Sequence, residues 1–186
     1  MAYKFKTVAL QHDGEHAKFV ELLKSEGIKS YLEIGSMYGG SFWRVRKALP
    51  VGSRMVAVDQ FSEKKDSRVS LLACVTELNV SGYNARLIVG NCHSKEVIEQ
   101  VREMGPYDCV FIDCNHSLKD VTLDWENYGP MAKIVAFHDI SSVIDKAGLN
   151  PIEVRKLWLE LREKYRHQEI ELATSGKSNG IGVLWR

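Results

Sequence analysis

Short apolar runs rich in β-branched residues alternate with longer stretches of helical periodicity through most of the chain. This alternation is typical of βαβ units, in which a helix joins two parallel strands and packs on one face of their sheet. We therefore predict an α/β fold of the Rossmann-like kind, a three-layer α-β-α sandwich around a mostly parallel sheet. The parallel strands are predicted at 31–34, 55–58, 85–89, 108–112 and 134–137, and the helices at 17–26, 41–49, 67–79, 94–104, 121–128 and 151–165.

The last part of the chain breaks this alternation. Two strand-like runs, 169–173 and 181–185, flank a segment rich in glycine and serine, which is typical of a closing antiparallel pair. They bring the predicted sheet to seven strands, with an antiparallel C-terminal strand. Because 186 residues fit one domain and no linker-like segment interrupts them, we predict a single domain over 1–186.

Composition narrows the possible partners and the compartment. The formal net charge of +1 gives no general attraction to nucleic acid or to an anionic membrane. The chain has no run of about 18 apolar residues that could span a bilayer, and its first residues lack the apolar core of a signal peptide. The four cysteines, Cys74, Cys92, Cys109 and Cys114, show no CxxC spacing, which favours reduced thiols over disulfides. We expect a cytoplasmic protein with neither a membrane nor a nucleic-acid partner.

Small, acidic and imidazole side chains follow the predicted parallel strands. In an open parallel sheet, ligands bind beyond the carboxyl ends of the strands, near the point where the strand order reverses. We therefore expect the functional site at this edge. The residues delivered there are Glu33 and Gly35, Asp59, Asn91, Asp113 with Asn115 and His116, and His138 with Asp139.

The turn after the first strand contains Gly35, Gly39 and Gly40. These glycines permit a sharp turn and a close approach of a ligand to the backbone. The spacing differs from the GxGxxG of dinucleotide-binding proteins, and by itself it also fits an ordinary tight turn. Asp59 follows Gly35 by 24 residues and ends the second strand, where a carboxylate accepts hydrogen bonds from ribose hydroxyls. A helix N-cap or a surface acid is the alternative interpretation of Asp59.

Taken together, these segments resemble a known family. The segments LEIG at 32–35, GGS at 39–41 and VAVD at 56–59 resemble motifs one and two of class I S-adenosylmethionine-dependent methyltransferases. The segments FIDCNHS at 111–117, AFHDI at 136–140 and GIGVL at 180–184 are similar to the small-molecule O-methyltransferase branch that includes macrocin- and cephalosporin-type enzymes and, more distantly, catechol O-methyltransferase. The resemblance covers about residues 15–186. It implies methyl transfer from S-adenosylmethionine to a hydroxyl group of a small acceptor.

The resemblance also implies a set of cofactor contacts. The turn around Gly35 would line the methionine part, and Glu33 would hold either that turn or the methionine ammonium group. Asp59 would accept hydrogen bonds from the ribose, and Asn91 and Cys92 would flank adenine, although many relatives have an acid in place of Asn91. The full set of cofactor-binding residues implied is Glu33, Gly35, Ser36, Gly39, Ser41, Asp59, Gln60, Asn91, Cys92 and Asp113.

A divalent cation such as Mg²⁺ is implied by the same resemblance. In metal-dependent relatives, carboxylates at the positions of Asp113 and Asp139 hold a hard cation, an ion that prefers oxygen ligands. Relatives often have a further acid or amide after the position of Asp139, where this chain has Ile140, so Asn115 is the candidate third ligand. The alternative is that Asp113 caps the following helix and Asp139 anchors a loop.

Two histidines are candidates for the catalytic base, because imidazole titrates near neutral pH. These are His138 and His116, which with Asp113 form the predicted catalytic set. The alternatives are a structural, hydrogen-bonded His138 and a His116 that caps the next helix. The remaining histidines are interpreted as surface or local polar groups, and they are His12, His16, His93 and His167.

Two other functions compete with methyl transfer. A nicotinamide-dependent oxidoreductase would share the sheet and the acid after the second strand, but the first turn gives it no support. A cofactor-binding subunit that has lost catalysis is the second alternative, because the segment between Asp139 and Pro151 is short for an acceptor lid. A short lid also suggests a site completed by a second copy of the chain, that is, a homodimer.

Overall fold

The computed structural model describes residues 13–61, 66–142, 152–171 and 179–186, and its centre is a seven-stranded sheet. The strand order is β3-β2-β1-β4-β5-β7-β6. The strands after β1 are added first on one side of it and then, from β4 on, on its other side, so the strand order reverses between β1 and β4. The strands are β1 (Ser30–Ile34), β2 (Arg54–Asp59), β3 (Asn84–Val89), β4 (Tyr107–Ile112), β5 (Ala132–His138), β6 (Arg166–Ile170) and β7 (Ile181–Trp185).

Strand directions match the predicted fold class. The first five strands pair in parallel, whereas β7 is antiparallel to both of its neighbours, β5 and β6. The carboxyl ends of β1 to β5 therefore lie at one edge of the sheet. The prediction of a mostly parallel, seven-stranded sheet with an antiparallel C-terminal strand is confirmed.

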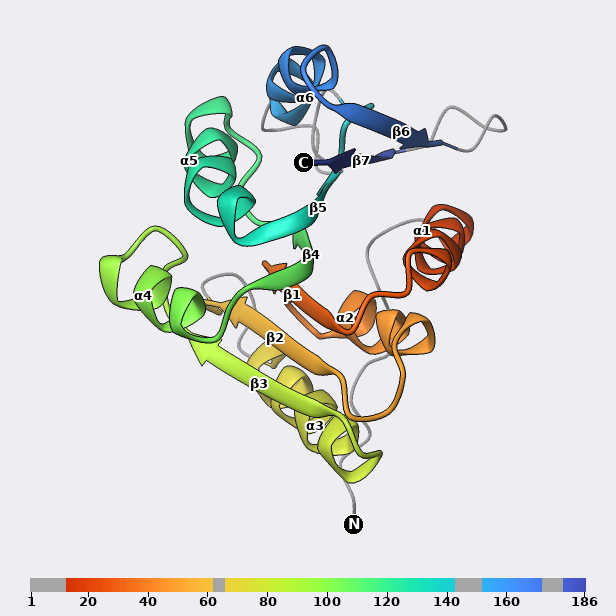
Figure 1. Cartoon of the computed structure of the whole chain (residues 1–186). Helices are drawn as coiled ribbons and strands as arrows, with labels where there is room; N and C mark the ends of the chain where they lie inside the picture. Colours follow the sequence, from red (N-terminus) through yellow and green to blue (C-terminus); the bar gives the residue numbers. More distant parts are fainter. Residues whose placement is uncertain (1–12, 62–65, 143–151, 172–178) are drawn as a thin grey trace.

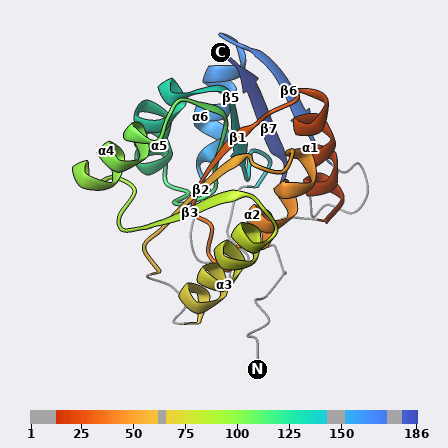
Figure 2. The ribbon, with the colours of Figure 1, turned by 60° about the horizontal axis from the view of Figure 1, so that its bottom comes forward.

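Helices cover both faces of the sheet, which confirms the three layers (Figure 1). On one face lie α1 (Asp13–Ser25), α2 (Gly40–Val45) and α3 (Ser67–Val80), and α1 runs beside β6 and β7 (Figure 2). On the other face lie α4 (Lys95–Glu103), α5 (Leu118–Tyr128) and α6 (Val154–Arg162). Two short 3₁₀ helices, Arg46–Ala48 and Gly129–Met131, follow α2 and α5.

The core consists of two apolar clusters, one on each face of the sheet. Side chains alternate between them along each buried strand, as the pleat requires. In β1, for example, Tyr31 packs with the helices of the first face and Leu32 with those of the second. Runs that are apolar at successive positions are therefore buried on both sides, as is typical of parallel sheets.

Element ends differ from the predicted ones at several places, and helices α1 and α5 begin earlier than predicted, at Asp13 and Leu118. The helix predicted at 41–49 is a six-residue α2 followed by a 3₁₀ turn, and Leu49 is extended because Pro50 follows it. Helix α6 begins at Val154, and Pro151 lies outside the described residues. Strand β6 begins three residues earlier than predicted, since its first four residues are polar and exposed at the sheet edge, and Ala173 lies outside the described residues.

No helix in the described ranges has both the length and the apolar character needed to cross a membrane. The four cysteines are free thiols in the structure.

Candidate functional site

Gly35 places the turn after β1 directly against the turn after β4. Its φ of +88° is one that residues with a side chain rarely adopt. Its amide donates a hydrogen bond to the carbonyl of Val58 in β2. A Cβ built on Gly35 would lie 2.2 Å from the carbonyl oxygen of Asp113. Only glycine fits here, and the two turns meet where the strand order reverses, the place where ligands bind in such sheets.

Asp59 holds the same turn from the end of β2. Its Oδ2 accepts a hydrogen bond of 2.7 Å from the amide of Met37, and its Oδ1 accepts one of 2.7 Å from the amide of Phe61. Helix α3 begins at Ser67, so the alternative interpretation of Asp59 as a helix N-cap is wrong. The half-buried carboxylate therefore anchors the turn, and each oxygen keeps a second lone pair for a ligand hydroxyl.

Glu33 lies beneath the turn with its side chain fully buried. Its two oxygens accept hydrogen bonds of 2.7 Å from the hydroxyls of Tyr31 and Ser41. Burial raises the pKa of Glu33 to about 7, although both hydrogen bonds act to lower it. Of the two roles considered for Glu33, holding the turn is the one its contacts support, and Ser41 is its partner.

We expect the substitution Glu33→Gln to flatten the dependence of stability on pH. Because the folded-state pKa is about 7 rather than 4.5, the folded chain binds this proton more tightly than the unfolded chain does. This carboxyl therefore lowers the unfolding free energy as pH rises from 4.5 to 7, by on the order of 3 kcal/mol. Urea unfolding of wild type and variant at pH 5 and pH 8 measures the effect. An equal difference between the two proteins at both pH values would contradict it.

The remaining predicted cofactor residues continue along the same edge. Gly39, at φ +81°, caps the start of α2, and Ser36 is buried within the turn. Gln60 is exposed directly after β2. Asn91 is exposed after β3, where its side-chain oxygen accepts from the amide of His93, whereas Cys92 is buried. These residues follow β1, β2 and β3 along one edge of the sheet, and their contacts with a cofactor stay predictions.

Two carboxylates and two imidazoles form a compact cluster at the ends of β4 and β5. Nδ1 of His138 lies 3.1 Å from Oδ1 of Asp113 and 3.2 Å from Oδ2 of Asp139. Nε2 of His116 lies 3.0 Å from Oδ2 of Asp139 and 3.9 Å from Oδ1 of Asp113. The sequence-based prediction that Asp113 and Asp139 lie together at neighbouring strand ends is consistent with this geometry.

Electrostatics keep the cluster charged. The carboxylates of Asp113 and Asp139 raise the pKa of His116 to about 10. Burial acts to lower the pKa of His138, but the same carboxylates outweigh it and raise this pKa to about 10 also. As protonated imidazoles at neutral pH, both histidines balance the carboxylates. Either one can act as a base only after its proton has left, and the catalytic roles of His138 and His116 stay predictions.

Helix capping does not explain this cluster. Ser117 is the N-cap of α5, and its hydroxyl accepts from the amide of Asp120. The alternatives in which Asp113 or His116 caps this helix are therefore wrong. Asp139 does form a local contact, accepting a hydrogen bond from the hydroxyl of Ser142, and its φ of +63° is unusual for a residue with a side chain.

The cluster has the donors of a cation site. One ligand atom from each of Asp113, His116 and Asp139 lies within 4.8 Å of the others. Despite its 3.0 Å approach to Asp139, Nε2 of His116 is buried without a well-aligned hydrogen bond. Asn115, the predicted third ligand, is exposed, and its role stays a prediction.

Two histidines interpreted as surface or local polar groups prove to be buried or clustered. His16 in α1 is only 1% exposed, and burial lowers its pKa to about 4. His93 lies 3.0 Å from the buried carboxylate of Asp124. A helix pattern alone could have pointed to His16, because it falls on the same face as Phe19 and Val20. His12 lies outside the described residues.

Comparison with known proteins agrees with this geometry. A family model described as a methyltransferase domain matches residues 32–140, which include every motif from the first turn to Asp139. No curated protein sequence matches the chain.

Solved structures share the fold at low sequence identity. The O-methyltransferase TomG from Streptomyces achromogenes, involved in tomaymycin synthesis and crystallised in complex with SAM, is 17% identical, with a TM-score of 0.71 over 95% of this chain and 81% of that one. A putative caffeoyl-CoA O-methyltransferase from Staphylococcus aureus is 16% identical, with a TM-score of 0.70 over 96% and 86% of the two chains. An O-methyltransferase from Bacillus cereus in complex with SAH is 19% identical, with a TM-score of 0.67 over 97% and 84%.

Proposed function

The chain belongs to the methyltransferase-domain family, and we propose that it transfers the methyl group of S-adenosylmethionine to a hydroxyl oxygen of a small acceptor with the help of a divalent cation. The observation that carries this proposal is the meeting of two sites at one sheet edge. The glycine turn and Asp59 lie beside the cluster of Asp113, His116, His138 and Asp139, and Gly35 touches the backbone of Asp113. A cofactor held by the first site would lie next to an acceptor held by the second.

The first site fits the cofactor's shape and chemistry. The φ of +88° at Gly35 turns the chain sharply after β1, and the missing side chain lets this turn pack against the backbone of Asp113, beside the place proposed for the cofactor. Asp59 presents carboxylate oxygens at the end of β2, where they can accept from ribose hydroxyls. Asn91 is exposed after β3, with donors and acceptors suited to the edge of adenine.

The second site fits a hard divalent cation held by Asp113 and Asp139. Two carboxylates converge there, and carboxylate oxygens are the donors that Mg²⁺ prefers. When bound, such an ion acts as a Lewis acid that lowers the pKa of an acceptor hydroxyl and orients it. Asp113 and Asp139 would stay ionised throughout, because the histidines lower the pKa of both.

The imidazoles of His116 and His138 are the candidate groups for proton transfer. Methyl transfer to a hydroxyl releases one proton, which needs an acceptor beside the oxygen. His116 is partly exposed, whereas the side chain of His138 is only 4% exposed and is held by the carboxylates. We therefore assign the proton-accepting role to His116, once its own proton has been lost, and the role of fixing the carboxylates to His138.

We expect Asp59→Ala to weaken binding of S-adenosylhomocysteine by roughly 2–4 kcal/mol, about 30- to 1000-fold in Kd. The variant loses the acceptor for two ribose hydroxyls and the anchor of Met37. Asp59→Asn keeps an acceptor for one of these groups and should lie between. Isothermal titration calorimetry measures each Kd.

Asp108→Ala is the matched control for this measurement. Asp108 also accepts hydrogen bonds from backbone amides, those of Lys29 and Ser30, but it lies near the start of β4, at the opposite edge of the sheet. This variant should lose stability without losing affinity. Equal affinity of wild type and Asp59→Ala for S-adenosylhomocysteine would contradict the assignment of Asp59 to the ribose. Retention of the protein on immobilised NAD rather than on immobilised S-adenosylhomocysteine would favour an oxidoreductase.

A panel of phenols, sugars and hydroxyacids tests turnover itself. Methyl transfer to an oxygen of any of these would support the proposal. Tight cofactor binding without turnover on the whole panel would instead favour a catalytically inactive partner subunit.

A further inference from the structure

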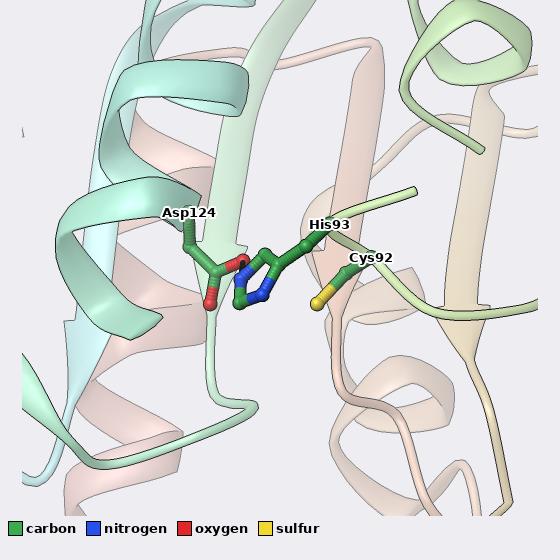
Figure 3. A group of neighbouring side chains, drawn as sticks. All are labelled: Cys92, His93 and Asp124. Atoms are coloured by element: carbon green, nitrogen blue, oxygen red, sulfur yellow. Dashed lines mark hydrogen bonds and ion pairs between the residues drawn. The ribbon is translucent and has the colours of Figure 1, made fainter. Parts of the chain in front are cut away.

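A second group of metal-type side chains lies between the turn after β3 and helix α5. Cys92 and His93 come from the turn, and Asp124 comes from the helix (Figure 3). One ligand atom from each lies within 4.8 Å of the others. In Figure 3 the imidazole of His93 lies between the carboxylate of Asp124 and the sulfur of Cys92.

Asp124 carries an unpaired ligand atom within this group. Its side chain is fully buried, and its Oδ1 lies 3.0 Å from Nε2 of His93. Its Oδ2 is also buried and has no hydrogen-bonding partner. A buried carboxylate oxygen without a partner is costly, and such groups in folded proteins call for an explanation such as a missing ion.

A fourth side chain, from the turn after β4, lies beside Cys92 but outside the group whose ligand atoms all lie within 4.8 Å of one another. Sγ of Cys114 lies 3.7 Å from Sγ of Cys92. Two sulfur ligands on one tetrahedral zinc ion lie about 3.8 Å apart, because each Zn–S bond is about 2.3 Å long. A disulfide would need about 2.05 Å, so the two thiols stand at the spacing of shared metal ligands rather than of a bond.

We propose that Cys92, His93, Cys114 and Asp124 bind a structural Zn²⁺ ion. Two thiolates, one imidazole and one carboxylate are the ligand types that zinc takes in closed, four-coordinate sites. Sulfur ligands distinguish this site from the cluster of Asp113, His116 and Asp139, whose oxygen donors suit a hard cation. Nδ1 of His93 lies 3.8 Å from Oδ1 of Asp120, and zinc-binding histidines commonly present their second nitrogen to such a carboxylate.

The site would join three parts of the sheet edge. Cys92 and His93 follow β3, Cys114 follows β4, and Asp124 belongs to α5. On binding, each thiol gives up one proton to solvent as its thiolate takes a place on Zn²⁺, and neutral His93 and ionised Asp124 complete the set without a redox change. Zinc would therefore stabilise the fold rather than take part in methyl transfer, and the proposal holds whatever the substrate is.

Cobalt substitution tests the site directly. Full-length protein is stripped with a chelator under reducing conditions and titrated with Co²⁺. We expect one equivalent to give a thiolate-to-cobalt charge-transfer band and visible bands of tetrahedral intensity, and one equivalent of Zn²⁺ to abolish both. Zinc should also raise the Tm and protect two thiols from a thiol reagent, because a ligand that binds only the folded state stabilises it.

Single variants separate the ligands from their surroundings. Cys92→Ala and Asp124→Asn should lose stoichiometric binding, and Cys114→Ser, at a half-buried position, should about halve the charge-transfer band. Cys109→Ala removes a buried thiol from β4 outside the group, and Asp139→Asn removes a ligand of the other cluster, so both should keep the band. Circular dichroism identifies variants that fail to fold, and for these Cys114→Ser gives the decisive result.

Three results would overturn the proposal. The first is the absence of a charge-transfer band in folded, reduced wild-type protein. The second is a band unchanged in Cys114→Ser, which would remove the fourth ligand. The third is zinc binding lost in Asp139→Asn but kept in Cys92→Ala, which would move the ion to the other cluster. None of these outcomes bears on S-adenosylhomocysteine binding, which tests the proposed function separately.

Discussion

Gly35→Ala is expected to abolish measurable binding of S-adenosylhomocysteine and to lower the unfolding free energy by about 3 kcal/mol or more. The backbone of the new alanine would be held in a left-handed conformation, which costs a residue with a side chain roughly 1–2 kcal/mol. Its Cβ would also lie 2.2 Å from the carbonyl oxygen of Asp113 and 2.8 Å from Cα of Cys114, both of them backbone atoms that cannot rotate away. Overpacking of this kind costs roughly another 1–3 kcal/mol. The turns after β1 and β4 must then move apart, and the turn after β1 is part of the proposed cofactor site.

Gly27→Ala separates the two causes. Gly27 has a similar φ of +65°, but a Cβ there would meet nothing within 4 Å. This variant should therefore show the backbone cost alone, and it should bind cofactor as the wild type does. Urea unfolding and calorimetry on the three proteins give both quantities. If Gly35→Ala were no less stable than Gly27→Ala and bound cofactor normally, the close packing of the two turns would be refuted.

Most of the fold could be predicted from local patterns in the sequence. Strands β2, β4 and β5 are mostly apolar at successive positions, as buried strands are, and a polar residue at or directly after the end of each marks where it stops. Because parallel strands share an edge, these ends could be placed together before any contact was known, and this is how Asp113, His138 and Asp139 were predicted to meet. Strand β6 was placed less well, since its exposed edge position removes the apolar signal.

Contacts that depend on packing between elements were not predictable in the same way. Asp124 appears in the sequence as one polar position of an amphipathic helix, and only the rotation of α5 about its axis decides that it is buried beside His93. The short distance between the sulfur atoms of Cys92 and Cys114 depends on how far two turns extend beyond the ends of β3 and β4, which are not adjacent in the sheet. The hydrogen bond from Ser41 to Glu33 likewise links a helix to a strand. A search for metal-ligand spacing in the sequence fails for the proposed zinc site, because Cys92, Cys114 and Asp124 are far apart in the chain.

The second prediction with a large effect concerns the cluster of Asp113, His116, His138 and Asp139 and its dependence on a divalent cation. We expect methyl transfer to be lost on exhaustive chelation and restored by Mg²⁺ or Mn²⁺, and we expect Asp113→Asn and Asp139→Asn to lower kcat by on the order of 10³-fold or more. Lewis-acid stabilisation of the reacting oxygen contributes several kcal/mol, and each 1.36 kcal/mol is tenfold in rate. S-adenosylhomocysteine should still bind to both variants, because Asp59 and the glycine turn are intact, and Asp108→Asn should keep its rate.

The test distinguishes a catalytic cation from a purely structural cluster. Each Asn substitution removes one negative charge from beside His116 and His138, whose pKa values of about 10 depend on both carboxylates. Some stability is therefore lost in either case, and loss of stability alone decides nothing. The decisive comparison is between kcat and Tm: a catalytic cation predicts a large fall in kcat for a small fall in Tm, and an activity that depends on the concentration of added Mg²⁺. Full turnover after chelation, with variants that lose Tm more than kcat, would refute the metal role. Catalysis would then rest on the proximity of the two substrates and on His116 as the proton acceptor.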